Sequence, residues 1–393
     1  MRRVLSLSTL YPNAHRPRFG TFVARQMEAL AAHGRWHVTV VNPIGVPPVP
    51  VGHYRALAAA ARDSVDDGVT VYRPRFSLIP GIGGALNPGM IARAVLPLAR
   101  QIHARQPFDL VDAQFFYPDG PAAAAIAEAL ALPLSIKARG ADIQLWGHKG
   151  FARRKMLAAA GRAAGLLAVS EALADDMAAL GMERGNIAIH YTGLDHALFR
   201  PLDHAASRAA LAELLGRSLP EGAPLLATVG ALIPRKGQMV VLRALAQLPD
   251  ANAVLVGEGL DRAELEAFAR GAGLSGRVHF AGSLDHRQLP LVLSAADAMV
   301  LPSASEGLAN AWVEALACGC PLVITEAGGA RELVTSPAAG RIVAREPEAI
   351  AHGVRELLAA APDRAAVAAC AERFSWDANA AALAAYYDRL VEA

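Results

Sequence analysis

Short apolar runs alternate along the chain with longer segments in which Ala, Leu and Arg recur at helical spacing. This alternation is typical of parallel strands joined by crossover helices, and it predicts an α/β fold. In the first half we expect strands at 4–9, 37–42, 69–73, 109–115, 134–138, 166–170 and 187–191. In the second half we expect them at 225–230, 253–257, 278–281, 298–301, 321–325 and 341–343.

The pattern restarts after Gly193-Leu194-Asp195, which indicates two doubly wound, Rossmann-like domains. A chain of 393 residues also exceeds what one hydrophobic core usually serves. We place the first domain at 1–195, the second at 196–374 and a hinge near 192–203. The segment 375–393 is predicted to be a helix that packs its apolar side chains on the first domain.

Composition bounds the class of protein. Hydrophobic residues make up 53% and charged residues 19%, which is typical of a globular chain. No uncharged apolar run reaches the roughly 18 residues that a membrane span needs. The three cysteines lack the paired spacing of a disulfide or zinc framework, so we expect a reducing, cytoplasmic location.

The charge is unevenly distributed. A net charge of +2 does not favour nucleic acid as a partner. Residues 1–195 carry 21 Lys and Arg against 14 Asp and Glu, whereas residues 196–393 carry 17 against 22. A basic first domain would suit an anionic membrane surface at the inner face of the cytoplasmic membrane. An incidental asymmetry is the alternative.

The segment 145–157 combines Trp146 and Phe151 with Arg153, Arg154 and Lys155. Such a patch could rest on anionic lipid and admit a lipid-linked acceptor. The blander interpretation is the solvated start of a helix.

Two common nucleotide-binding motifs are missing. Neither half contains Gly-x-Gly-x-x-Gly after its first strand, which disfavours a nicotinamide dehydrogenase. The Gly-x4-Gly-Lys-Ser/Thr pattern of nucleotide triphosphatases is also absent.

The strand at 225–230 runs into a loop that ends in Arg235-Lys236-Gly237, directly before a predicted helix. Two cations at this place can hold an anion toward which backbone N–H groups also point. We therefore expect a phosphate there. Two solvated basic residues in a loop are the alternative.

Two glutamates lie eight positions apart after the strand at 298–301. Glu306 falls in the loop, whereas Glu314 falls within a helix of Ala, Trp, Val and Leu, where an unpaired carboxylate is costly. Hydroxyl groups of a sugar or ribose are natural partners for both. Alternatively, Glu306 is an ordinary loop residue and Glu314 caps backbone N–H groups.

These motifs, together with Gly257-Glu258-Gly259 and Gly328-Gly329, resemble the retaining glycosyltransferases of family 4 over nearly the whole chain. The opening segment Tyr11 to Gln26 is most similar to the group that includes a teichuronic-acid biosynthesis glycosyltransferase. The resemblance implies the GT-B fold, in which two Rossmann-like domains face each other across a cleft. It also implies a donor-binding second domain and an acceptor-binding first domain.

The resemblance implies roles for particular residues. Arg235 and Lys236 would hold the donor diphosphate, Glu306 the hydroxyls of the donor sugar and Glu314 the ribose; the first three form the expected catalytic group. The other expected donor-binding residues are Gly20, Gly230, Gly257, Gly307, Leu308, Ala309 and Asn310. Arg139 and Asp142 would lie on the acceptor side, where many relatives have His in place of Arg139.

The predicted reaction is transfer of a sugar, with retention, from a nucleotide-diphosphate sugar to a glycan or polyprenyl-linked glycan, as in bacterial surface polysaccharide synthesis. Because the sequence has no Asp-x-Asp, we expect no metal and no cofactor beyond the nucleotide sugar. A nucleotide-sugar epimerase and a non-catalytic sugar-nucleotide-binding subunit are the alternatives.

Overall fold

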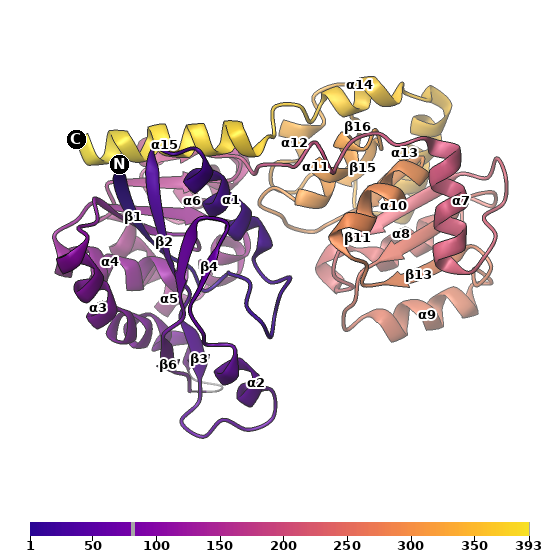
Figure 1. Ribbon diagram of the computed structural model, residues 1–393. Coiled ribbons are helices and arrows are strands. Elements are labelled where there is room, and N and C mark those ends of the chain that lie inside the picture. The colour runs from indigo at the N-terminus through magenta and orange to yellow at the C-terminus, as the bar shows by residue number, and fades with distance from the viewer. Residues whose placement is uncertain (80–82, 393) are drawn as a thin grey trace. The chain divides into compact units, whose positions relative to one another are not determined.

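The computed structural model describes residues 1–79 and 83–392, which divide into two compact units (Figure 1). Unit 1 contains residues 1–193 and the C-terminal segment from residue 376, and unit 2 contains Leu194–Ser375. The expected division lay between residues 195 and 196, with the C-terminal helix assigned to the first domain.

Unit 1 is built on an eight-stranded sheet in the order β10-β9-β8-β7-β1-β2-β5-β4. All neighbouring pairs are parallel except β4 with β5. The strands are β1 (Arg2–Leu7), β2 (Trp36–Val41), β4 (Ser64–Asp66), β5 (Val69–Tyr72), β7 (Leu110–Ala113), β8 (Leu134–Ala138), β9 (Gly165–Ala168) and β10 (Ile187–Ile189). A separate two-stranded sheet pairs β3 (Ile44–Val46) with β6 (Arg75–Ser77).

Helices connect these strands. They are α1 (Thr21–Ala32), α2 (His53–Ala59), α3 (Asn87–Arg105), α4 (Asp119–Leu130), α5 (Gly150–Ala160) and α6 (Glu171–Ala179), with short helical turns η1 (Gly83–Ala85), η2 (Asp142–Trp146) and η3 (Arg184–Asn186). The C-terminal helix α15 (Trp376–Glu392) packs on α1. Its Tyr387 ring meets the Trp36 ring edge to face at 5.4 Å, and Leu383 is buried beside it in the same core. This burial of apolar surface fixes α15 to unit 1.

Unit 2 has a six-stranded, wholly parallel sheet in the order β13-β12-β11-β14-β15-β16. Its strands are β11 (Leu225–Val229), β12 (Asn252–Val256), β13 (Val278–Gly282), β14 (Ala298–Leu301), β15 (Leu322–Thr325) and β16 (Gly340–Val343). Its helices are α7 (His204–Leu215), α8 (Gln238–Leu245), α9 (Arg262–Gly271), α10 (Leu289–Ala295), α11 (Asn310–Ala317), α12 (Ala330–Leu333), α13 (Pro347–Ala360) and α14 (Arg364–Ala369), with turns η4 (Pro234–Lys236) and η5 (His286–Gln288).

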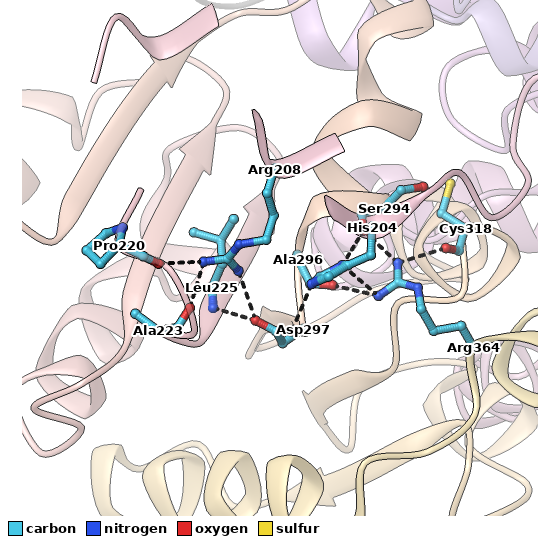
Figure 2. A network of polar contacts seen from close by, with 10 residues as sticks. All are labelled: His204, Arg208, Pro220, Ala223, Leu225, Ser294, Ala296, Asp297, Cys318 and Arg364. Carbon is cyan, nitrogen blue, oxygen red and sulfur yellow. Dashed lines mark hydrogen bonds and ion pairs between the residues drawn. The ribbon is translucent and has the colours of Figure 1, made fainter. Parts of the chain in front are cut away.

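A polar network fastens α7 to the sheet of unit 2 (Figure 2). Arg208 donates to the backbone oxygen of Ala223 at 2.7 Å and pairs with Asp297 at 3.3 Å. Asp297 in turn accepts from the Leu225 N–H at 2.7 Å, at the start of β11. Arg364 donates to the Ser294 backbone oxygen at 2.8 Å. Asp297 therefore has a structural role.

The prediction of two Rossmann-like α/β domains with parallel sheets is confirmed, and each predicted strand is present. Some predicted strands are longer than the observed ones. The strand predicted at 109–115 is observed as Leu110–Ala113. The three-residue strands β3, β4 and β6 were not predicted. No helix within the described part of the chain is long and apolar enough to cross a membrane.

Candidate functional site

Three of the predicted site residues meet at the carboxyl edge of the unit 2 sheet. Strands β11 and β14 are neighbours, so the loops that follow them emerge side by side. Lys236 Nζ lies 2.5 Å from Glu306 Oε1, and Arg235 Nη1 lies 3.3 Å from Glu306 Oε2. The two cations and the carboxylate form one ion-paired cluster in the structure.

The cluster carries more positive than negative charge. Glu306 is 7% exposed, and its single carboxylate faces two cations. The side chain of Arg235 is 39% exposed and that of Lys236 is 14% exposed. A pre-positioned, partly accessible pair of cations is suited to binding an anion such as a diphosphate.

Glycines let the surrounding loops approach closely. A Cβ on Gly257, which has φ +139°, would lie 2.0 Å from the Gly230 backbone oxygen. A Cβ on Gly328 would lie 2.2 Å from the Glu306 backbone oxygen, and the neighbouring Gly329 N–H donates to the Gly307 oxygen at 2.8 Å. A larger residue at Gly328 would displace the loop that carries Glu306, and one at Gly257 would displace the loop after β11 that leads to Arg235.

Arg345 is a site residue that the sequence analysis missed. Its Nε donates to the Pro302 oxygen at 2.8 Å and its Nη2 to the Pro234 oxygen at 2.6 Å. One guanidinium thus links the loop before Arg235 to the loop before Glu306. A single Arg beyond β16 has no motif around it, so no sequence signal was available.

The second glutamate lies apart from this ion pair. Glu314, 8% exposed within α11, has its Oε1 2.9 Å from His286 Nε2. The structure therefore gives Glu314 a side-chain partner from η5 that sequence reasoning did not identify. Leu308 and Ala309 are buried just before α11, and Asn310 is its first residue. The first backbone N–H groups of a helix have no partner within that helix.

In unit 1, Gly20 precedes α1, whereas Arg139 and Asp142 follow β8. Asp142 is completely buried, and its carboxylate accepts from the N–H groups of Phe116 at 2.8 Å, Gly140 at 2.8 Å and Arg139 at 3.0 Å. Burial raises the pKa of this carboxyl group. Its hydrogen bonds hold the Arg139 loop in place, so any acceptor-side role of Asp142 would be positional.

The side chain of Arg139 is part of a hydrogen-bonded chain that runs through the side-chain amides of two glutamines. Its guanidinium and the ammonium of Lys137 both donate to Gln26 Oε1, at 3.2 and 3.0 Å. Gln26 Nε2 donates to Gln114 Oε1 at 3.0 Å, and Gln114 Nε2 donates to Asp112. The two glutamines therefore separate the cations from the one carboxylate in this chain.

Lys137 also contacts His190 Nδ1 at 2.5 Å, and His190 Nε2 lies 2.9 Å from the Asn379 backbone oxygen of α15. This geometry fits a neutral imidazole that accepts at Nδ1 and donates at Nε2. Burial lowers the pKa of Lys137 and of His190 well below their usual values, and it lowers that of Arg139 to about 10. Neither Lys137 nor His190 was a predicted site residue.

A cavity of about 360 Å³ opens in unit 1 near the carboxyl ends of β1 and β2. Its lining combines polar side chains with aromatic ones, among them Asn13, Arg16, His53, Asn87, Phe19 and Phe76. Arg139 and Asp142 are not among the lining residues.

In the basic segment 145–157, several side chains have partners within unit 1. Lys149 Nζ lies 4.2 Å from the Trp146 ring centroid, and Arg153 donates to the Leu180 oxygen at 2.8 Å. Leu145 remains 57% exposed and Phe151 36% exposed. Part of the basic charge therefore supports the fold.

The described residues include no group of three or more His, Cys, Asp or Glu side chains placed to hold a metal ion. Metal independence remains a prediction. Cys318 and Cys320 are buried, and burial raises the pKa of the Cys318 thiol to about 12.

Comparisons with known proteins agree on one family. Residues 19–193 match the model of the glycosyl transferase 4-like domain, and residues 216–374 match that of glycosyl transferases group 1. A putative teichuronic acid biosynthesis glycosyltransferase, TuaC of Bacillus subtilis, is 30% identical over 84% of this chain and 82% of its own length. A D-inositol 3-phosphate glycosyltransferase of Mycolicibacterium gilvum is 37% identical over 53% of this chain and 47% of its own.

Solved structures share the fold. HepE of Anabaena, solved in complex with UDP, is similar with a TM-score of 0.74 and 22% identity, over 99% of this chain and 100% of its own. The sucrose-phosphate synthase of Thermosynechococcus elongatus is similar with a TM-score of 0.77 and 21% identity, over 100% of both chains. These neighbours are GT-B glycosyltransferases, so the predicted fold class is confirmed.

Proposed function

The chain belongs to the group 1, or family 4-like, glycosyltransferases, and from this premise we propose that it transfers a sugar from a nucleotide-diphosphate sugar with retention and without a metal. The proposed acceptor is a glycan or polyprenyl-linked glycan of a surface polysaccharide. The TuaC relative supports polysaccharide synthesis, and HepE, solved with UDP and with UDP-glucose, supports a nucleotide-sugar donor.

The observation that carries this proposal is the cluster of Arg235, Lys236 and Glu306 at the carboxyl edge of the unit 2 sheet. In our proposal the two cations bind the diphosphate, and Glu306 accepts hydrogen bonds from the hydroxyls of the donor sugar. Glu314 binds the ribose by exchanging its contact with His286 for a ribose hydroxyl. In unit 2, the proposed close approach of the donor is to the backbone of Gly307 to Asn310, Gly230 and Gly257. Gly20, in unit 1, stays a donor-binding residue predicted from the sequence resemblance.

During transfer, the bond between the anomeric carbon and the phosphate oxygen breaks, and a bond from the acceptor oxygen to that carbon forms on the same face. The leaving diphosphate takes the proton of the acceptor hydroxyl. Negative charge grows on the diphosphate as this happens, and fixed cations stabilise it. In this scheme Arg235 and Lys236 stabilise the negative charge that Mg²⁺ stabilises in other sugar transferases.

We assign donor binding to unit 2 and acceptor binding to unit 1. The unit 1 cavity supports the acceptor assignment, because its polar and aromatic lining suits a sugar. Arg139 does not line this cavity, and its acceptor-side role stays a prediction from the sequence resemblance, with Asp142 holding its loop. Partial accessibility of Leu145 and Phe151 supports a peripheral contact with anionic membrane at the cytoplasmic face.

Product analysis tests the proposal. The protein is incubated with UDP-glucose as the first nucleotide-sugar probe, then with other nucleotide sugars, with and without glycan acceptors and with EDTA. We expect acceptor-dependent release of nucleoside diphosphate that EDTA leaves unchanged, and a product of retained anomeric configuration by NMR. Conversion of the nucleotide sugar without acceptor would instead indicate an epimerase, and binding without turnover a non-catalytic subunit.

Lys236→Ala sharpens this test. We expect it to fold normally and to lose about a hundred- to a thousandfold in turnover, as when one oxyanion-stabilising donor is removed. Arg243→Gln is the matched control, since it removes one positive charge from α8 of the same unit at an exposed position. Equal rates for the two variants would contradict the site assignment.

Membrane contact has a separate test. Vesicles with a fifth of anionic lipid should pellet the wild-type protein, and Leu145→Ser with Arg154→Glu should abolish pelleting. Absence of wild-type pelleting would remove this part of the proposal and leave the catalytic part intact.

A further inference from the structure

Unit 2 contains a second cavity, of about 280 Å³, which is lined by residues of α9 and of the edge strand β13. It is lined by residues of α9, by Leu215 and Arg217 at and just after the end of α7, and by Ser275, Val278, His279 and Phe280. These last residues belong to the amino-terminal half of β13 and the turn before it. Because the sheet is parallel, this end of β13 is opposite the carboxyl edge that carries Arg235 and Glu306. Arg262, the first residue of α9, extends the lining toward the carboxyl edge, but none of the proposed donor-binding residues lines the cavity. The cavity is therefore not part of the proposed donor site.

Positively charged side chains outnumber negatively charged ones in the lining of this cavity. Arg217, Arg262 and Arg270 line it, together with one carboxylate, that of Glu266. Arg262 Nε lies 2.5 Å from Glu266 Oε1, so this carboxylate is already engaged. Within residues 1–79 and 83–392, the structure records no ion pair for Arg217 or Arg270. Their charges are surplus in a half of the chain that is otherwise acidic.

A buried imidazole adds a donor to these charges. His279 is 4% exposed and lines the cavity, and neither ring nitrogen has a hydrogen-bond partner among the described residues. Burial lowers the pKa of His279, and the nearby Arg217 lowers it further. The ring is then neutral and carries one N–H. A buried N–H without an acceptor is unfavourable, and a ligand oxygen would relieve that cost.

We propose that Arg217, Arg270 and His279 form a binding site for the phosphate group of a small molecule, separate from the site that binds the donor. Two guanidinium groups can each bind phosphate oxygens in a bidentate manner, and the imidazole N–H supplies a further bond. Ser275 also lines the cavity, and its hydroxyl group can serve as a further donor. Leu215, Val278 and Phe280 provide an apolar wall, so a sugar phosphate fits the cavity as well as free phosphate does.

The test uses the full chain with uniformly ¹⁵N-labelled histidine. Inorganic phosphate and glucose 6-phosphate are titrated separately at constant pH and ionic strength, and the imidazole signal of His279 is identified by its loss in His279→Gln. We expect a saturable shift of that signal. Tighter binding of glucose 6-phosphate would identify a sugar phosphate as the ligand, and tighter binding of inorganic phosphate would identify free phosphate.

Variants establish where the anion binds. Arg217→Gln and Arg270→Gln should each weaken binding about ten- to a hundredfold, the loss expected for a charge-assisted hydrogen bond. Lys236→Ala should leave the His279 titration unchanged, since that residue belongs to the proposed donor site. Arg243→Gln is the charge-matched control, and melting temperatures establish that each variant folds.

Two results would overturn the proposal. One is a His279 signal that does not move, or moves without saturating, with both phosphates. The other is equal affinity in the wild type and in folded Arg217→Gln and Arg270→Gln variants. Arg217→Lys and Arg270→Lys provide a second set that keeps the charge, and these should bind with intermediate affinity.

Discussion

The two units place charged residues at the carboxyl edges of similar parallel sheets, but they arrange these charges differently. In unit 2, Arg235 and Lys236 pair directly with Glu306, and Arg235 remains partly exposed. In unit 1, Lys137 and Arg139 reach Asp112 only through the side-chain amides of Gln26 and Gln114.

The two clusters differ in how easily a ligand can reach their charged groups. A ligand can reach the unit 2 cluster through Arg235, whose side chain is 39% exposed, and exchange contacts there with the buried Glu306 carboxylate. In the unit 1 cluster Lys137, Asp112, Gln26 and Gln114 are buried and Arg139 is half-buried, and all are already hydrogen-bonded, so these groups determine loop shape and core stability. Substitutions in the unit 2 cluster should therefore change turnover while the stability stays constant. Substitutions in the unit 1 cluster should change stability first.

The largest expected effect is that of Glu306→Gln on turnover. The amide keeps the shape of the side chain but removes the charge that holds Arg235 and Lys236 in position and accepts sugar hydroxyls. We expect turnover with the nucleotide sugar to fall about a hundred- to a thousandfold, with the melting temperature within a few degrees of wild type. Glu213→Gln, at an exposed position of α7, is the control. Wild-type turnover of Glu306→Gln would contradict the proposal that the unit 2 cluster binds the donor whereas the unit 1 cluster supports the fold.

The fold was predictable because its main strands are apolar runs of β-branched and other hydrophobic residues that a helix period does not fit. The strand β4 (Ser64–Asp66) has no such run, so sequence alone did not reveal it. Arg235, Lys236 and Glu306 could be selected because charged residues directly after buried strands gather at one sheet edge. Their actual pairing required the order of β11 and β14 in the sheet.

Other contacts depend on residues far apart in sequence. Arg345 bonds the oxygens of Pro302 and Pro234, which lie 43 and 111 positions earlier. Lys137 meets His190 across 53 positions. A lysine within the apolar run 134–138 was the one available signal, because a buried ammonium needs partners. The sequence could indicate that such partners exist but not which residues they are.

The next largest effect concerns Asp142. In Asp142→Ala, the buried N–H groups of Phe116, Arg139 and Gly140 lose their acceptor. An unsatisfied buried donor costs about 1–3 kcal/mol, so the free energy of unfolding should fall by at least about that amount. Urea unfolding followed by circular dichroism measures this change. Asp176→Ala, at an exposed position of α6, should be close to neutral. A stable Asp142→Ala protein would show that the loop is held by other contacts.

His190, which contacts Lys137 in unit 1, allows a pH-dependent test of the comparison between the charge clusters of the two units. Its folded-state pKa lies well below 6.5, because the ring is buried beside Lys137, with Arg139 also near. The unfolded state therefore binds the additional proton, and stability should fall as the pH drops below about 6.5, by at most about 1.4 kcal/mol per pH unit. The carboxyl of Asp119, whose pKa burial raises to about 7, acts in the opposite direction.

The contribution of His190 is therefore obtained by difference. Unfolding free energies of the wild type and His190→Gln are measured between pH 5 and 8. The variant should lose less stability on acidification than the wild type does. His148→Gln, at an exposed position, should follow the wild-type curve. Parallel curves for wild type and His190→Gln would mean that the imidazole is not held neutral by its surroundings.

The smallest expected effect is that of Arg345→Ala. Removing the guanidinium frees the Pro234 and Pro302 oxygens to water, so both loops survive but their relative position becomes less fixed. Because Arg345 does not itself contact the cations or Glu306, we expect KM for the nucleotide sugar to rise a few-fold to tenfold with little change in kcat. Arg355→Ala, which removes a donor to the Gln247 oxygen at 2.8 Å elsewhere in unit 2, should leave both constants unchanged. A fall in kcat without a change in KM would place Arg345 in the reacting charge cluster rather than in its support.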